Sequence, residues 1–128
     1  MSDGLLDTSL FIATETARPL RHDRLPDRLF VSVITIGELR AGVLAAVDVD
    51  TRDRRLATLT EALAFDPLPI DERVAEVWAR LRITLRDLGR RMPVNDSWIA
   101  ATAIAWQMPI VTQDDDFQPL PGLEVVRV

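Results

Sequence analysis

Short runs of apolar residues alternate along the chain with longer segments in which apolar residues recur at helical spacing. This pattern predicts short strands separated by amphipathic helices. Short apolar runs with polar or turn residues on either side predict strands at 4–7, 29–33, 110–112 and 123–128, with a very short extended piece ending at Ile70. Helical spacing predicts helices at 8–16, from Ser32 or Thr35 to about 47, at about 51–65, at 71–88, and from Asn95 or Asp96 to about 106.

Two of these helices show their buried face clearly in the sequence. The first carries its apolar residues at Ile36, Leu39, Val43 and Val47. The second begins at Asp71, ends at Gly89, and carries Val74, Val77, Trp78, Leu81, Leu85 and Leu88. Strands that alternate with helices predict a parallel sheet covered on both faces. We therefore expect one domain spanning residues 1–128, an α/β fold with three α/β/α layers and a short central sheet.

Composition excludes several classes of chemistry. The chain has no Cys, no Lys, and a single histidine, His22, in a polar stretch, while all 15 cationic residues are Arg. Thiolate metal sites, P-loops and Schiff-base lysines are therefore excluded, and His22 is expected to be a solvated surface residue. A net charge of −5 argues against bulk attraction to nucleic acid, although a bound cation and local arginines can reverse the sign in one cleft.

No apolar stretch approaches the roughly 20 residues that a membrane span needs, and the N-terminal residues lack the pattern of a signal peptide. We therefore expect a cytoplasmic protein.

Five carboxylates stand where a buried segment ends or a helix begins: Asp7, Glu38, Asp96, Asp114 and Asp116. The carboxyl ends of parallel strands meet at one edge of the sheet, where ligands usually bind. Carboxylates gathered there repel one another unless a cation joins them, so the pattern predicts a Mg²⁺ or Mn²⁺ site. Taken singly, each has an ordinary alternative as a cap, a turn residue or a solvated acid.

Several of these residues and their neighbours have both a structural and a site role open to them. Thr35 and Glu38 have the spacing of a capping box, but helical side chains lean toward the N-terminus, which aims Glu38 at the sheet edge. Asp96 is expected to cap its helix and also to reach the ion. Asp115 should point away from its two acidic neighbours and is left out of the site. Arg90 and Arg91 either contact phosphate near the metal or form a solvated loop.

Four segments, in this order along the chain, resemble the PIN-domain ribonucleases: LLDTSLFI, ITIGELRAGV, DSWIAATA and VTQDDDFQPLPGLEVV. More narrowly they look like the VapC toxins of bacterial type II toxin–antitoxin systems, over essentially the whole chain. The resemblance implies a three-layer α/β/α domain with an acidic Mg²⁺ or Mn²⁺ pocket that cleaves RNA. It also implies a VapB-type antitoxin as partner and a homodimer.

The resemblance also implies roles for single residues. Asp7, Asp96 and Asp114 match the main metal ligands, and Asp116, before the family-like Phe117, matches an auxiliary one. Glu38 matches an acid that ligates metal or orients the attacking water. Thr112 matches a threonine that lines the pocket, and Ser9 takes the place of the family's usual asparagine.

Three other functional hypotheses compete with the ribonuclease hypothesis. A response-regulator receiver also uses an acidic Mg²⁺ pocket, but it relies on a lysine that this chain lacks. A haloacid-dehalogenase-like phosphatase typically has a second aspartate two residues after the first, where this chain has Ser9. A catalytically silent PIN-like module, which acts through its antitoxin or another partner, is the alternative that stays open.

Overall fold

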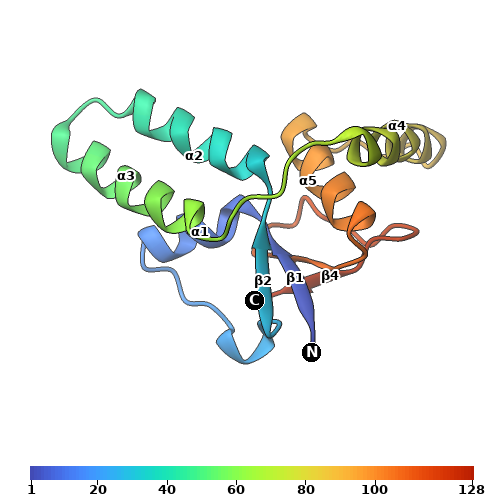
Figure 1. Ribbon diagram of the computed structural model, residues 1–128, viewed down its shortest axis with the longest axis horizontal. Helices are drawn as coiled ribbons and strands as arrows, with labels where there is room; N and C mark the ends of the chain where they lie inside the picture. Colours follow the sequence, from blue (N-terminus) through green and yellow to red (C-terminus); the bar gives the residue numbers. More distant parts are fainter.

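The computed structural model describes residues 1–128 and contains a four-stranded parallel sheet with helices on both faces (Figure 1). The strands are β1 (Asp3–Leu6), β2 (Arg28–Val31), β3 (Ile110–Thr112) and β4 (Val125–Arg127), in the spatial order β2-β1-β3-β4. The helices are α1 (Thr8–Glu15), α2 (Val33–Ala45), α3 (Val49–Leu63), α4 (Glu72–Asp87) and α5 (Val94–Ala105), with a 3₁₀ turn at His22–Arg24. The expected α/β/α fold is confirmed.

Side-chain alternation along the strands builds two separate cores. Leu5 and Ile110 pack with α4 and α5 on one face, whereas Leu6 and Val111 pack with α1, α2 and α3 on the other. Successive residues of a strand point to opposite faces, so runs of adjacent apolar residues are what a sheet covered on both sides requires. Figure 1 shows the same division, with the α2–α3 pair to one side of the sheet and the α4–α5 pair to the other.

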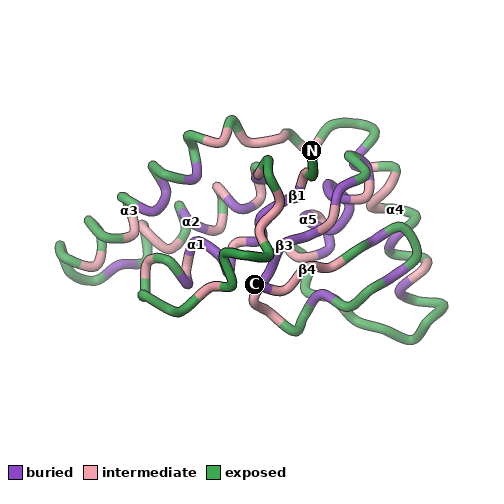
Figure 2. The backbone as a smooth tube through the Cα atoms, turned by 90° about the horizontal axis from the view of Figure 1, so that it is seen from below, coloured by how far each residue is buried: buried purple, intermediate pink, exposed green.

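Buried backbone gathers along the sheet and the inner faces of the helices, while the distal ends of the helices are exposed (Figure 2). Two residues that were predicted to lie in the core are instead exposed at such helix ends. Val47 lies beyond the end of α2 and is 96% exposed, and Leu88 follows the last residue of α4 and is also exposed. Both continue a helical period past the point where the helix stops. No helix combines the length and the apolar character needed to cross a membrane.

Candidate metal-dependent active site

The five predicted carboxylates all lie on segments that meet at the carboxyl edge of the sheet. Asp7 follows β1, Glu38 stands in the second turn of α2 after β2, and Asp114 and Asp116 follow β3. Asp96 comes to the same place from the first turn of α5. The other four negative charges all contribute to raising the pKa of Asp96, so the five groups are within electrostatic reach of one another.

Asp7 is the buried centre of the group, with 2% of its surface exposed. It caps α1 by accepting a hydrogen bond from the Ser9 backbone N–H at 3.4 Å, and Thr112 Oγ1 donates to its Oδ2 at 3.0 Å. Burial raises the pKa of Asp7 although these hydrogen bonds pull it down. Asp7 is therefore a helix cap whose carboxylate is also buried at the carboxyl end of β1.

Asp96 differs from its expected role, because it does not cap α5. The helix begins at Val94, the cap position is Pro93, and no side chain accepts a capping hydrogen bond there. The Pro93 carbonyl accepts the first helical bond from the Ser97 N–H at 2.9 Å, which places Asp96 inside the first turn. Burial, reinforced by the surrounding carboxylates, raises the pKa of Asp96 to about 7.

Glu38 takes no part in the capping box that the sequence offered as its alternative role. Ser32 caps α2 through a bond from the Ile34 N–H at 3.1 Å. Glu38 Oε1 instead accepts a hydrogen bond from Thr8 Oγ1 at 2.8 Å, and the Thr8 hydroxyl also pairs with the fully buried Thr35 hydroxyl at 2.9 Å. This hydroxyl pair fixes Glu38 from the side of α1.

The three acids of the turn after β3 have different surroundings. Burial raises the pKa of Asp114, as do the charges of Asp7 and Asp116, and its backbone N–H donates to Thr112 Oγ1 at 2.9 Å. Asp116 is exposed. Asp115 faces elsewhere, with its Oδ1 3.6 Å from Arg127 Nε.

Three further hydroxyl residues support the site, and for two of them, Thr8 and Thr35, the sequence predicted only a helix-capping role. Ser9, which the resemblance marks, has its Oγ 3.3 Å from Thr112 Oγ1 and accepts the Gln113 N–H at 3.1 Å. A polar residue directly after a strand-end aspartate is the signal that could have identified Thr8.

None of the five carboxylates forms an ion pair. The six ion pairs of the structure use other acids: Asp3, Glu15, Asp23, Glu76, Asp87 and Asp115. The charge of Arg18 lowers the pKa of Asp114, but burial and the neighbouring acids outweigh it. The cluster therefore carries negative charge that no ion pair within the chain neutralises.

The chemistry of this donor set fits a hard divalent cation. All the donors are carboxylate and hydroxyl oxygens, which Mg²⁺ and Mn²⁺ prefer. A bound cation would lower the raised pKa values of Asp7, Asp96 and Asp114, because it stabilises their charged forms. No three acidic groups are drawn together into a ready-made set of ligands. An ion would therefore take part of its shell from water, as Mg²⁺ usually does in proteins.

The remaining candidates lie apart from this cluster. His22 is exposed, as expected. Two other aromatic residues stand outside the site: Trp98 stacks on Trp78 with ring centroids 4.2 Å apart, and Trp106 is 43% exposed. Arg90 and Arg91 line a separate hollow beside the start of α5.

Comparison with known proteins places the chain in a family. The model of the PIN domain matches residues 4–123. Ribonuclease VapC5 of Mycobacterium tuberculosis is 51% identical over 98% of this chain and 95% of its own length, and Ribonuclease VapC4 of the same organism is 48% identical over 98% and 96%. The crystal structure of VapBC-5, a member of the VapBC family of toxin–antitoxin systems from that organism, has a chain that superposes with a TM-score of 0.92 at 46% identity, covering all of both chains. The chain therefore belongs to the PIN-domain family and, within it, to the VapC proteins.

Proposed function

We propose that this chain is a Mg²⁺- or Mn²⁺-dependent endoribonuclease, the toxin of a VapBC-type toxin–antitoxin system, with residues 1–128 forming one nuclease domain. One observation supports the proposal: five carboxylates lie on segments that end at the carboxyl edge of the sheet, none forms an ion pair, and burial together with the other four charges raises the pKa of Asp96 to about 7. Such a group is destabilising unless it binds a cation. The names of the VapC relatives supply the reaction class.

In this proposal Asp7, Asp96 and Asp114 hold the metal directly or through water, with Asp116 as an auxiliary ligand. When bound there, the ion would supply Lewis-acid chemistry: it would polarise the scissile phosphate and favour ionisation of water. Glu38 accepts a hydrogen bond from the attacking water and so aims its oxygen at phosphorus. One P–O ester bond breaks as the new P–O bond forms; the attacking water loses a proton to solvent, and the leaving oxygen takes one from solvent, so the step is balanced.

The chain's hydroxyl groups keep these carboxylates in position. Thr112 Oγ1 holds one oxygen of Asp7, and Thr8 Oγ1 holds Oε1 of Glu38, so each acid keeps its other oxygen for the metal or water. Single-stranded or looped RNA is the proposed substrate, since its phosphates and bases are accessible. We further propose that a VapB-type antitoxin covers the site, that the toxin is a homodimer, and that it acts in the cytoplasm.

The test compares Asp7→Asn with Asp50→Asn for Mg²⁺-dependent cleavage of a single-stranded RNA. Asparagine caps helices as well as aspartate does and can accept the Thr112 hydrogen bond, so the first variant should fold but lose cleavage. Asp50 lies in the first turn of α3, outside the cluster, so the second variant should cleave at the parent rate. Cleavage by Asp7→Asn at the parent rate would refute the proposed site. A parent protein that binds Mg²⁺ in calorimetry but cleaves no RNA would favour the silent binding module instead.

A further inference from the structure

Four arginines converge on one hollow at the end of α4. This arginine pocket has a volume of ≈ 290 Å³. Its lining consists of four guanidinium groups, three apolar side chains and one hydroxyl, from Arg82, Arg86, Arg90, Arg91, Leu85, Met92, Val94 and Ser97. In a chain of net charge −5, so many cations around one concavity are a local reversal of sign.

The local sequence brings these arginines together. Arg82 and Arg86 are four residues apart, which places them on one side of α4. Gly89 ends the helix with a φ of +66°, and the Arg90 N–H donates to the Leu85 carbonyl at 2.9 Å, which turns the chain back against the helix. Like charges at this spacing destabilise a helix, so stability alone does not account for the arrangement.

Three of the four guanidinium groups have no carboxylate partner. Only Arg86 forms an ion pair, with Asp87 at 3.3 Å. Arg90 Nη1 donates to the carbonyl of Pro119 at 3.2 Å, and Arg82 lies over the ring of Trp78 at 5.0 Å from its centroid. These contacts orient the guanidinium groups without neutralising them.

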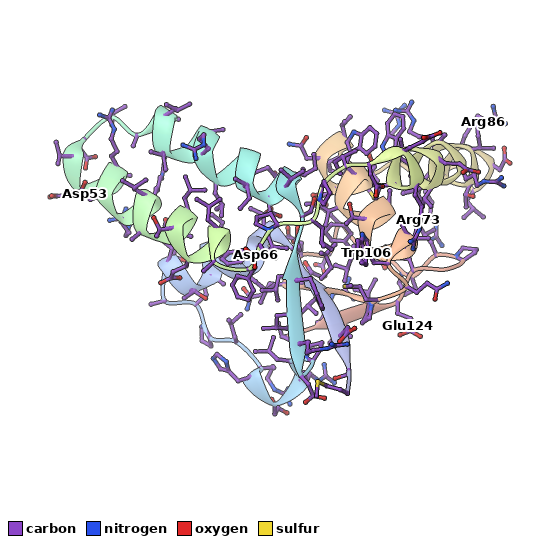
Figure 3. The ribbon with its side chains drawn as sticks, viewed as in Figure 1. Asp53, Asp66, Arg73, Arg86, Trp106 and Glu124 are labelled. Atoms are coloured by element: carbon purple, nitrogen blue, oxygen red, sulfur yellow. The ribbon has the colours of Figure 1, made fainter.

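The arginine pocket and the acidic cluster share the first turn of α5. Two of the pocket's wall residues, Val94 and Ser97, belong to the first turn of α5, the same turn that carries Asp96. The bond from Arg90 to Pro119 ties the pocket to the segment that follows the acidic turn. Figure 3 shows Arg86 at the far end of α4, whereas Arg73 of the same helix lies beside Trp106, away from the pocket.

We propose that the arginine pocket binds a backbone phosphate of the RNA strand whose scissile phosphate lies at the carboxylate cluster. This inference rests on the proposed function. Guanidinium groups bind phosphate through paired N–H donors, and Leu85 and Met92 give the hollow an apolar lining that strengthens the attraction. Because the metal site itself repels RNA until a cation binds, a second anchor of opposite sign would hold the strand.

The test measures binding of a fluorescent single-stranded RNA by anisotropy, in EDTA so that no cleavage occurs, at several salt concentrations. The pocket variant is the double substitution Arg82→Gln and Arg91→Gln, and Arg91→Gln alone is a milder one. The control is Arg73→Gln with Arg80→Gln, which removes the same charge from exposed α4 positions outside the pocket. Circular dichroism melts check folding in each case.

We expect the pocket variant to bind RNA about tenfold more weakly or worse. The slope of log K against log salt should become shallower by about 0.7 for the double variant, the value for one lost phosphate contact, and by less for Arg91→Gln. The control should bind within about twofold of the parent. Equal weakening in both double variants would overturn the proposal, because it would show attraction by overall charge. Parent-like affinity of the pocket variant would also overturn it, and would favour an acidic protein partner for this surface.

The two proposals fail separately. If the parent cleaves RNA with Mg²⁺ but the pocket variant binds RNA normally, the pocket assignment is wrong and the proposed function stands. If the parent binds RNA through the pocket but Asp7→Asn cleaves as well as the parent, the catalytic site is wrong and the pocket stands.

Discussion

The raised pKa of Asp96 makes a quantitative prediction about the metal-free protein. Raising a carboxyl pKa from 3.8 to about 7 corresponds to about 4 kcal/mol. Because Asp96 is only partly buried, solvent screening reduces the figure to about 2 kcal/mol. Against this, a charged acid in the first turn of a helix contributes about 0.3–1 kcal/mol of stabilisation. Repulsion and burial therefore win, and Asp96→Asn should stabilise the metal-free protein by about 1–2 kcal/mol at pH 8.

The sign of the pH dependence follows from the raised pKa. Between about pH 4 and pH 7 the folded protein keeps the Asp96 proton that the unfolded chain has lost. The free energy of unfolding of the parent therefore falls as pH rises through this window. Asparagine does not titrate, so the advantage of Asp96→Asn should be full above pH 7 and disappear near pH 4.

Thermal and urea unfolding in EDTA at pH 4, 6 and 8 measure this difference. At pH 8 we expect Asp96→Asn to melt about 5 °C above the parent. The matched control is Asp50→Asn, a first-turn acid of α3, which should lose about 0.3–1 kcal/mol across the same pH range. If the proposed function holds, Mg²⁺ at a hundred times its Kd should stabilise the parent by about 2.7 kcal/mol and reverse the order of the two proteins. A metal-free Asp96→Asn protein less stable than the parent at pH 8 would refute the electrostatic account of this site.

Two further substitutions test how the acids are positioned. Thr8→Val removes the hydroxyl that donates a hydrogen bond to Glu38. The kcat for RNA cleavage should fall about tenfold to hundredfold, while Mg²⁺ affinity in calorimetry stays nearly constant. An unchanged kcat would show that Glu38 does not need this hydrogen bond. Arg127→Met removes the hydrogen bond from Nη2 to the Phe117 carbonyl at 3.0 Å. Urea unfolding should show a loss of about 1 kcal/mol in the free energy of unfolding, and calorimetry should show weaker Mg²⁺ binding. Unaltered Mg²⁺ affinity would limit Arg127 to a structural role.

The sequence predicted the parts of the site that depend on local order. Asp7 and Asp114 follow apolar runs closely, and the end of a buried strand in an α/β fold is a defined place. Their position at one edge therefore needed only the strands and their parallel arrangement. The strand at Ile110–Thr112 was predicted with the bounds that the structure shows.

The contacts between helices could not be predicted in the same way. The Thr8 hydroxyl meets Glu38 across 30 positions of sequence, and the meeting depends on the register in which Leu6 pairs with Val31. The start of α5 was misplaced for a different reason. Asn95 and Asp96 are good capping residues, but the Pro93 carbonyl already accepts the first helical bond. Tertiary placement of the preceding loop overrode the local preference.

The distribution of charge argues for function more strongly than any single residue does. The chain has 15 arginines, and one guanidinium beside Asp96 would offset the burial and the repulsion that raise its pKa. Instead, the structure leaves the carboxylates without an ion pair and gathers arginines on the other side of the first turn of α5. Pairing the two sets would favour folding, but it would fill the sites that a cation and a phosphate need. A protein that binds both a cation and a phosphate needs the carboxylates and the arginines kept apart, as they are on the first turn of α5. This requirement accounts for the stability that the unpaired carboxylates cost, which packing cannot explain.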